Sequence, residues 1–443
     1  MNDVPDGFKM TELGPLPEEW KVVNLGDVFE FSRKPRGILK DNAEVPFIPM
    51  EHISDNSSRI NGWQLKNVSE ISSGTFVLRN DLVIAKITPS FENGKQAVLD
   101  NLPEAYGYAT TEIWAIHPKN QTVIVEYLYN YLKMPPIRAD LASKMEGSTG
   151  RQRLPRHVLQ NLQFSLPPLP EQHAIARMLS TVQEAREKTE AAIDATRELK
   201  KSLMKHLYTY GPVPLQDADK VPLKETEIGL VPERWEIASL EQHATVQTGI
   251  AKGRKLEGED TIKVPYLRVA NVQDGYLDLS EMKYIEVRPS EMNRYSLQHN
   301  DVVVTEGGDF DKLGRGFIWH GEIPCCVHQN HIFAVRTKHD ALIPEYLAYL
   351  IQSEYGKSFF LTVAHRTTHL ACINSKKLKG FPVLLPDIKE QKRIAHTLNS
   401  VDHKIQALEN KKNAIDALFQ TLLQNLVTAK IRVNHMGAET CGN

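Results

Sequence analysis

The feature that most constrains this chain is a long amphipathic stretch near its end. From Ile388 to Leu426, apolar residues recur at alternating spacings of four and three, and only Lys412 interrupts the series. A mean period close to 3.5 that is held over several heptads favours a helix that supercoils against a second helix. Asp387 and Glu390 form a capping-box pattern, which predicts that the helix begins there.

A related stretch occurs earlier in the chain. A shift of 219 residues places residues of this first copy on identical residues of the second. The matching residues of the first copy are Leu166, Pro167, Glu171, Gln172, Ile175, Ala176, Leu179 and Val182. Beyond Val182 the seam in the matching register is weaker, whereas a second register is continuous and rich in small residues. Small residues permit close approach, so we expect the two helices to pair with each other. Each helix would have about 40 residues and a length of roughly 60 Å.

The repeat extends beyond these helices. The segment T-E-L-G-P-L-P-E-E-W, Thr11 to Trp20, returns as T-E-I-G-L-V-P-E-R-W, Thr226 to Trp235. Further matches join Val45-Pro46 to Val264-Pro265, Asn80-Asp81 to Asn300-Asp301, and Glu126-Tyr127-Leu128 to Glu345-Tyr346-Leu347. The chain is therefore a tandem duplication of one unit, and each unit is a globular half followed by a long helix.

Each globular half has a mixed pattern, which predicts an α+β fold class. Short β-like runs are separated by Gly, Asn, Asp and Pro turns, and a short helix is expected near Val125 to Leu132 and near Pro344 to Gln352. The β-like runs are Leu82–Ile87, Glu112–Ile116, Val302–Thr305 and His331–Arg336. The predicted boundaries are 1–165 and 224–383 for the globular halves, 166–210 and 384–432 for the helices, 211–223 for a linker and 433–443 for a tail.

Bulk properties limit the class of protein. The formal net charge is −2, so any nucleic-acid binding must come from local patches. The four cysteines are too few for a disulfide framework, no apolar run is long enough to span a membrane, and the N-terminus lacks an apolar signal region. We therefore expect a cytoplasmic protein.

Catalytic and metal-binding patterns are largely missing from the sequence. There is no [D/N]-P-P-[Y/F/W] motif of a DNA aminomethyltransferase and no phosphate loop. The glycines between Gly307 and Gly316 are interpreted as a turn or binding loop. Cys325, Cys326, His328 and His331 have thiol and imidazole groups, but strand alternation would separate the two thiols and no second ligand pair is at a suitable spacing. We therefore expect no metal site and no cofactor.

Basic runs are more informative, because they occur at related places in both units. Each run is depleted in acidic residues and contains Gly, Ser, Thr or Asn, which suits a loop that touches phosphates and base edges. The runs are Arg33, Lys34, Arg36 and Lys40 with Lys252, Arg254 and Lys255 after the tryptophan repeat, and Lys144, Arg151, Arg153 and Arg156 with Arg366, Lys376, Lys377 and Lys379 before the long helices.

The duplicated motifs resemble those of a known family. Two diverged globular halves, each followed by a P-x-x-x-E-Q-x-x-I-A helix at Pro167 and Pro386, are similar to the specificity (S) subunits of Type I restriction-modification systems. The resemblance covers essentially the whole chain. It implies two target recognition domains that each read one half of a bipartite DNA sequence, separated by two long helices in an antiparallel coiled coil with a pseudo-twofold repeat. It also implies docking of two modification (M) subunits, addition of restriction (R) subunits, and no catalysis by this chain.

The resemblance and the basic runs together define candidate residues. Base contact is expected in the loops 151–156 and 306–315, so Asp309, Lys312 and Arg315 join the basic residues above as DNA-binding candidates. Glu171, Gln172, Glu390 and Gln391, predicted to be exposed, are the candidates for contacting M subunits. The alternative for these four is that acid and amide groups simply favour helix initiation in the first turn.

Two other classes of function remain open on the sequence. A coiled-coil scaffold without DNA binding would keep the long helices but leave the paired basic loops unexplained. A self-contained enzyme would need a catalytic constellation, and the scattered residues Glu306, Asp309 and His328 supply none that we recognise. Sequence-specific, salt-sensitive DNA binding would exclude the scaffold, and methyl transfer by the isolated chain would favour the enzyme.

Overall fold

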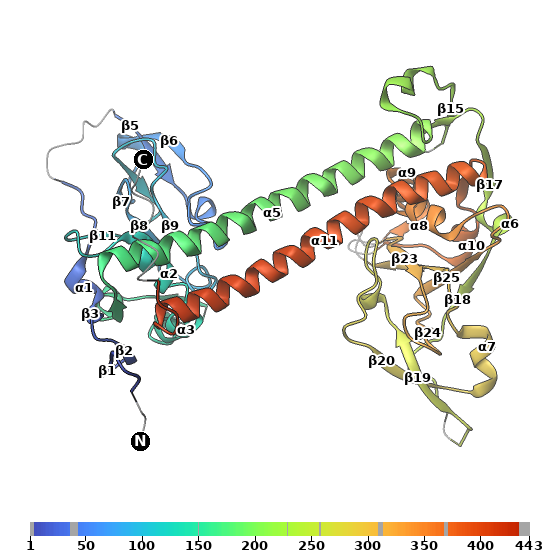
Figure 1. Ribbon diagram of the computed structural model, residues 1–443. Coiled ribbons are helices and arrows are strands. Elements are labelled where there is room, and N and C mark those ends of the chain that lie inside the picture. The colour runs from blue at the N-terminus through green and yellow to red at the C-terminus, as the bar shows by residue number, and fades with distance from the viewer. Residues whose placement is uncertain are drawn as a thin grey trace. The chain divides into compact units, whose positions relative to one another are not determined.

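Two long helices, α5 (Leu169–Tyr210) and α11 (Ile388–Val427), are the largest elements of the computed structural model (Figure 1). The structure describes residues 4–35, 43–148, 150–227, 229–256, 258–308, 313–366 and 371–433. The predicted helix from Ile388 is confirmed to within one residue. The first helix begins at Leu169, because Gln163–Leu166 form a strand, β14, that pairs with β3 (Lys21–Asn24). No described helix is both long enough and apolar enough to cross a membrane.

The chain forms two compact units, and each long helix contributes to both. Unit 1 comprises Met1–Ala192 with Leu408–Asn443, and unit 2 comprises Ile193–Ala407. Unit 1 therefore contains the beginning of α5 and the end of α11, whereas unit 2 contains the end of α5 and the beginning of α11.

The other elements of unit 1 are short. Its strands are β1 (Phe8–Thr11), β2 (Gly14–Pro17), β3, β4 (Phe29–Phe31), β5 (Glu44–Ile48), β6 (Gln64–Asn67), β7 (Thr75–Leu78), β8 (Leu82–Ala85), β9 (Gln96–Val98), β10 (Tyr106–Ala109), β11 (Ile113–Pro118), β12 (Glu146–Ser148), β13 (Arg151–Arg153) and β14. Its short helices are α1 (Leu25–Val28), α2 (Val125–Tyr131), α3 (Pro135–Ser143) and α4 (Arg156–Gln160), with 3-10 turns at Met50–His52 and Val68–Glu70.

Unit 2 repeats this order with small differences. Its strands are β15 (Leu223–Thr226), β16 (Gly229–Pro232), β17 (Glu236–Ser239), β18 (Ala244–Thr248), β19 (Ile262–Leu267), β20 (Lys283–Val287), β21 (Asp301–Thr305), β22 (Gly307–Gly308), β23 (Gly316–Trp319), β24 (Val327–His328), β25 (Ile332–Thr337), β26 (His365–Arg366), β27 (Ala371–Cys372) and β28 (Pro382–Leu385). Its short helices are α6 (Leu240–His243), α7 (Met292–Tyr295), α8 (Pro344–Gln352), α9 (Glu354–Val363) and α10 (Ser375–Lys379), with 3-10 turns at Leu215–Lys220, Val269–Asn271 and Pro289–Glu291.

The sheets confirm the duplication at the level of strand order. Unit 1 has a four-stranded sheet β4-β11-β8-β9, and unit 2 has the corresponding sheet β18-β25-β21-β23. A second sheet, β6-β5-β10-β7, corresponds to β20-β19-β24, in which β19 and β24 are parallel. The predicted α+β class with an internal repeat is therefore confirmed, and the predicted strands and short helices lie within one to two residues of the observed ones.

The long helices run antiparallel in each unit. In unit 1, Arg186 of α5 pairs with Asp416 of α11 at 2.6 Å, and Glu190, one turn further along α5, pairs with Lys412, one turn back along α11, at 2.8 Å. In unit 2, Lys200 pairs with Asp402 at 2.7 Å. Lys412, which interrupts the apolar seam, therefore has a carboxylate partner, and its hydrogen bond lowers the pKa of Glu190.

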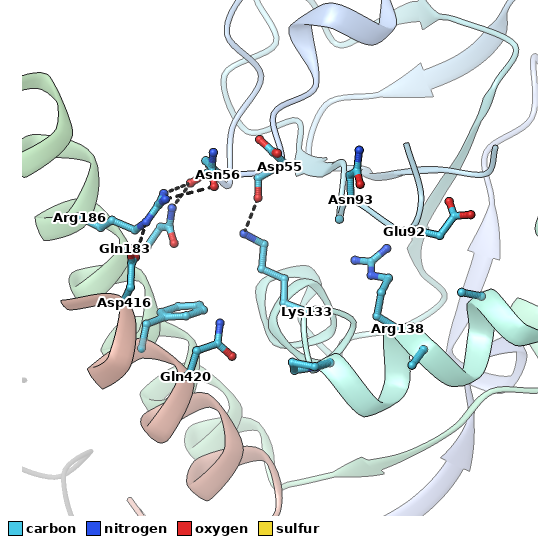
Figure 2. Close-up of a pocket in the computed structure, with 15 residues that line it drawn as sticks. Asp55, Asn56, Glu92, Asn93, Lys133, Arg138, Gln183, Arg186, Asp416 and Gln420 are labelled. Atoms are coloured by element: carbon cyan, nitrogen blue, oxygen red, sulfur yellow. Dashed lines mark hydrogen bonds and ion pairs between the residues drawn. The ribbon is translucent and has the colours of Figure 1, made fainter. Parts of the chain in front are cut away.

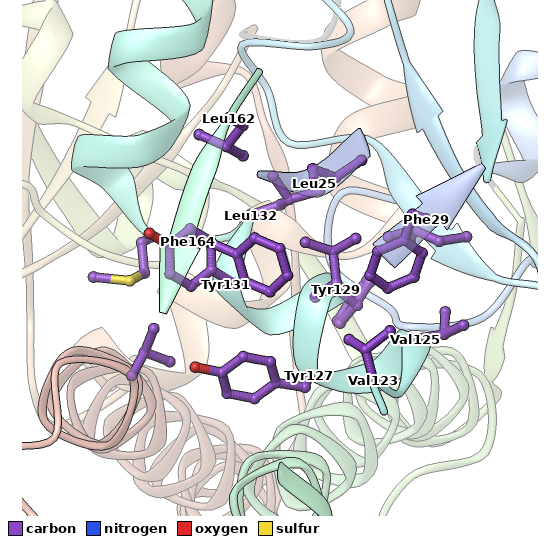
Figure 3. Packing of buried hydrophobic residues seen from close by; sticks show 14 of the residues in the cluster. Leu25, Phe29, Val123, Val125, Tyr127, Tyr129, Tyr131, Leu132, Leu162 and Phe164 are labelled. Atoms are coloured by element: carbon purple, nitrogen blue, oxygen red, sulfur yellow. The ribbon is translucent and has the colours of Figure 1, made fainter. Parts of the chain in front are cut away.

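The core of unit 1 lies between α2, the paired strands β3 and β14, and the long helices. Figure 3 shows Tyr127 and Tyr131 of α2 beside Phe164 of β14, with the Tyr131 and Phe164 ring centroids 5.5 Å apart. The hydroxyl of Tyr127 is buried and donates to the Ser165 carbonyl at 2.9 Å. The end of α11 completes this core with Phe419, Leu423, Leu426 and Val427.

A repeated Asn-Asp turn enters the central strand of each main sheet. Asn80 and Asn300 have φ values of 68° and 70°, a left-handed conformation that asparagine tolerates better than most residues. Asp81 and Asp301, which follow, are fully buried, and each accepts a backbone N–H at 2.8 Å. The countercharge differs between the two units.

In unit 1 the partner of this aspartate is a histidine. His117 Nδ1 lies 3.5 Å from Asp81, and its Nε2 lies 3.2 Å from Glu30. Hydrogen bonding to Asp81 raises the pKa of His117, and Glu30 adds to this, whereas burial opposes it. In unit 2 the same place is taken by Arg336, which binds Asp301 through two hydrogen bonds of 2.8 Å.

Replacement of His117 with Arg should remove a pH dependence of stability from unit 1. Since the folded-state pKa of His117 is raised above its unfolded value of 6.5, its contribution is fully present below that pH. The contribution is lost as pH rises through the folded-state pKa, and an arginine stays charged throughout. Urea unfolding of the full chain between pH 6 and 8 should show a smaller loss of stability for H117R than for wild type. The exposed His157→Arg is the control, and equal slopes in H117R and wild type would contradict the prediction.

Candidate nucleic-acid interface

The start of α5 is held by a buried carboxylate. Glu171 is 3% exposed and accepts the indole N–H of Trp20 through Oε2 at 2.8 Å. Arg432, which follows α11, binds the same carboxylate at 2.7 Å and also reaches Glu19 at 2.9 Å. The hydrogen bond to Glu171 raises the pKa of Arg432. The two duplicated motifs, T-E-x-G-x-x-P-E-x-W and P-x-x-x-E-Q, therefore meet in one contact.

Unit 2 builds the same contact at the start of α11. Glu390 accepts the indole N–H of Trp235 at 3.1 Å. Its cationic partner is Arg234, the residue before the tryptophan, at 2.5 Å. The arginine thus comes from a different part of the chain in each unit, although the carboxylate and the indole are equivalent.

The neighbouring glutamines are buried and bonded in the same way. Gln172 accepts the Ile124 N–H at 3.0 Å and donates to the carbonyls of Thr122 and Pro167. Gln391 makes the equivalent bonds with Ile343, Ala341 and Pro386. Each glutamine joins the loop before a short helix to the first turn of a long helix.

The predicted exposure of these four residues is therefore wrong. Glu171, Gln172 and Gln391 are buried and the side chain of Glu390 is 18% exposed, because each side chain faces its own unit. The capping box at α11 is also only half formed. Asp387 accepts the Glu390 N–H at 2.8 Å, but the Glu390 side chain binds Trp235 and Arg234 instead of the cap.

Some basic residues after the tryptophan repeat are exposed, and another forms an ion pair within its own unit. Arg33 and Lys34 are exposed in unit 1, as are Lys252 and Lys255 in unit 2. Arg254 pairs with Glu291 at 2.5 Å, so it belongs to the fold of unit 2. Arg36 and Lys40 lie outside the described residues.

The runs before the long helices show the same division. Arg151 and Arg153 are exposed on the hairpin β12–β13, and Lys376 is exposed on α10. Arg156 stacks on Phe31, 4.2 Å from the ring centroid, and Lys144 pairs with Asp140 at 2.7 Å. Of the remaining candidates, Lys377 donates to the Val363 carbonyl, and Arg315 is half-buried and donates to Gln273 at 3.4 Å. Asp309, Lys312 and the side chain of Arg366 lie outside what the structure describes.

A surface groove of unit 1 lies beside the β12–β13 hairpin. It has a volume of about 620 Å³ and is lined by Lys86, Glu112, Trp114, Glu146 and Arg153, among others. Lys86 lies 4.2 Å from the centroid of the Trp114 ring, and burial lowers the pKa of Lys86. Arg153 pairs with Glu112 at 2.7 Å. The groove therefore places two cations, two carboxylates and an aromatic face together on an accessible surface.

Sequence reasoning identified Arg153 but missed Lys86 and Trp114. Lys86 is a single lysine at the end of an apolar run and has no local basic neighbours. The repeat could have identified Lys86, because the corresponding residue of unit 2, Glu306, lies in the loop that was predicted to contact bases. There Glu306 pairs with His331 at 2.5 Å.

The cysteine and histidine cluster is dispersed in the structure. Cys326 and His328 are buried, and burial raises the pKa of Cys326 to about 12 and lowers that of His328 to about 4. Cys325 is exposed, and His331 is engaged by Glu306. Within the described residues, no group of three or more His, Cys, Asp or Glu side chains is arranged to hold a metal ion.

A second cleft in unit 1 is lined by several charged and amide side chains. It has a volume of about 510 Å³, and Figure 2 shows Lys133 and Arg138 reaching into it. Lys133 donates to the Asp55 carbonyl at 3.3 Å, and burial lowers its pKa to about 8. Arg186 binds both Asp416 and Asn56. These bonds tie the loop at Asp55 and Asn56 to the turn between α2 and α3 and to the two long helices.

Comparison with known proteins decides the family. The family model of the Type I restriction modification DNA specificity domain matches residues 17–195 and 232–417. The chain belongs to this family. The two matches of the specificity domain coincide with the two copies of the repeat.

Curated relatives cover the whole chain. The specificity subunit of the type I restriction enzyme MjaVIII from Methanocaldococcus jannaschii is 25% identical over 444 residues, which are 97% of this chain and 97% of the relative. The specificity subunit of EcoKI from Escherichia coli strain K12 is 22% identical over 429 residues, 95% of this chain and 90% of the relative.

Solved structures share the fold. The S subunit of a Type I restriction-modification system from M. genitalium has a TM-score of 0.55 at 13% identity, covering 92% of this chain and 96% of that one. A chain from a type I R-M system, solved in a study of complex assembly and conformational transition, has a TM-score of 0.54 at 17% identity, covering 94% and 99%. The fold of this specificity-domain protein is therefore that of known S subunits.

Replacement of Glu171 with Gln should destabilise unit 1 by about 2 to 3 kcal/mol, because Arg432 loses the buried one of its two carboxylate partners and keeps only Glu19. Glu184→Gln on the same helix is the matched control, since that side chain is 64% exposed and should change stability by less than about 0.5 kcal/mol. Urea unfolding of the full chain measures both. Equal stabilities of E171Q and E184Q would show that the carboxylate does not anchor α5.

Proposed function

We propose that this chain is the DNA sequence-specificity subunit of a Type I restriction-modification complex. In this proposal each unit reads one half of an asymmetric, two-part DNA target, and the paired long helices set the gap between the halves. Two M subunits dock on the chain and R subunits join that core. The chain performs no catalysis of its own, needs no cofactor, and works in the cytoplasm.

The observation that carries the proposal is the double match to a DNA specificity domain, one match on each copy of the repeat. The internal frameworks of the copies are equivalent, as the pairs Trp20–Glu171 and Trp235–Glu390 illustrate. The partly exposed residues differ, for example Lys86 in one copy and Glu306 in the other. Equivalent frameworks with different surfaces suit two readers of unequal half-sites.

Exposed cations support contact with DNA despite the net charge of −2. Arg33, Lys34, Arg151 and Arg153 in unit 1, and Lys252, Lys255 and Lys376 in unit 2, are exposed. Phosphate contacts by such residues position a protein on a duplex, and arginine reads guanine in the major groove. Two similar readers on one duplex would meet grooves about one turn, or a small multiple of it, apart.

The four motif residues at the helix starts take an indirect part in this proposal. Glu171, Gln172, Glu390 and Gln391 face inward, so their contribution to docking of M subunits would be to fix where each long helix begins. The docking surface itself would then consist of exposed residues of α5 and α11. Removal of a motif residue should weaken assembly only to the extent that it unfolds its unit.

The experiment that tests the function is expression of the chain with its M subunit and mapping of methylated adenines in cellular DNA. Methylation confined to a gapped, two-part sequence is expected, because the two readers are joined through a helical spacer. Cells that express either subunit alone are the control. A stable complex that methylates no gapped sequence would favour the scaffold alternative, and methylation by the isolated chain would favour an enzyme.

Combined replacement of Arg151 and Arg153 with Ala should impair recognition of one half-site only. Both side chains are exposed on one hairpin of unit 1, and loss of their contacts should weaken that half-site roughly 10-fold or more. Lys252→Ala with Lys255→Ala in unit 2 is the matched control for the other half-site. Methylation of plasmids with single substitutions in either half-site measures the effect. Equal loss of discrimination in both half-sites would contradict the assignment.

A further inference from the structure

Lys86 and Glu306 occupy the same place in the two units. Each follows the central strand of a main sheet, β8 or β21. The Lys86 N–H donates to the Glu112 carbonyl at 3.0 Å, and the Lys86 carbonyl accepts the Leu154 N–H at 2.8 Å. The Glu306 N–H donates to the His331 carbonyl at 2.9 Å, and its carbonyl accepts the Ile373 N–H at 2.8 Å. The backbone around the two positions is therefore equivalent, and the side-chain charge is reversed.

In unit 1 the position has hydrogen-bond donors available to a ligand. Lys86 lines the open groove, with its ammonium over the Trp114 ring. Within the described part of the chain its Nζ makes no hydrogen bond, and one oxygen of the nearby Glu112 is engaged by Arg153 at 2.7 Å. A lysine has three N–H donors and no acceptor. The site is therefore suited to an acceptor-rich partner.

In unit 2 the position has an acceptor available instead. One oxygen of Glu306, Oε2, binds His331 Nδ1 at 2.5 Å. The other oxygen has no hydrogen-bond partner among the residues that the structure describes, and the side chain is 28% exposed. A carboxylate that is fixed by a histidine through one oxygen can accept an N–H through the other.

These chemistries correspond to opposite base edges in the major groove. Guanine presents two acceptors, N7 and O6, which lysine or arginine can bind, whereas cytosine presents an amino donor, which glutamate or aspartate can accept. We propose that Lys86 and Glu306 are specificity-determining residues, Lys86 reading a guanine in the half-site of unit 1 and Glu306 reading a cytosine in the half-site of unit 2. This inference rests on the proposed function and assigns base classes to its two reading surfaces.

The test uses the complex of the full chain with its M subunit. Lys86→Met keeps the apolar stem over Trp114 but removes the donors, and Glu306→Gln keeps the size of the side chain but removes the carboxylate. Each variant is compared with wild type by adenine methylation mapping and by competition between duplexes that carry each of the four base pairs at each target position. K86M should lose roughly 5- to 100-fold of its discrimination at one guanine of one half-site, and E306Q at one cytosine of the other.

Matched controls separate a reading role from a structural one. Lys66→Met removes another lysine of unit 1 that stacks on an aromatic ring, 4.0 Å from the Phe47 centroid, and Glu281→Gln removes a paired carboxylate of unit 2. Both should keep the wild-type target. If a variant loses all methylation, the duplex competition still reports its preference, and a preference unchanged from wild type overturns the inference.

The outcomes distinguish this inference from the function on which it rests. If the wild-type complex methylates no gapped sequence, the proposed function fails and the inference fails with it. If wild type has a gapped target and both variants discriminate at every position as wild type does, only the inference is overturned. Relaxation at a position that is not guanine for K86M, or not cytosine for E306Q, would also overturn it.

Discussion

The structure depends on a carboxylate in the first turn of each long helix, which is buried at Glu171 and largely enclosed at Glu390. A buried, ionised carboxylate is costly unless it is paired and hydrogen-bonded, and here a tryptophan indole and an arginine meet that requirement. Because Glu171 and Glu390 must reach Trp20 and Trp235, the point at which each helix leaves its globular part is fixed. Gln172 and Gln391 bind backbone groups of the loop on the other side, so each helix start is tied both to the tryptophan repeat and to that loop.

Much of the fold could be predicted from the sequence because its signals are local and occur twice. The apolar period predicted α11 to within one residue, and the duplication predicted two equivalent globular halves. The exposure of Glu171 and Gln172 could not be predicted in the same way. An acid and an amide in a first helical turn are typical of helix initiation, whereas their burial depends on Trp20 and the loop at Ile124, which are distant in sequence.

The candidate interface was predicted less well, because charge runs do not reveal which side chains the fold itself uses. Arg254 forms an ion pair with Glu291, and Arg156 stacks on the face of Phe31. Arg151 and Lys376, which belong to similar runs, are exposed. Lys86 had no local signal, since one lysine after an apolar strand is common. Lys86 becomes a candidate only through comparison with Glu306. The two residues have equivalent backbone positions and opposite charges, and this equivalence is visible only when the two folded units are compared.

The division of the long helices between the units has a consequence for the order of folding during synthesis. Unit 2 is a single continuous segment, Ile193–Ala407, whereas unit 1 needs Leu408 onward as well as the first residues of the chain. The core of unit 1 includes Phe419, Leu423, Leu426 and Val433. The half that leaves the ribosome first is therefore completed last. Until the segment from Leu408 onward is made, the tyrosine-rich core of unit 1 is uncovered and Glu171 lacks its partner Arg432.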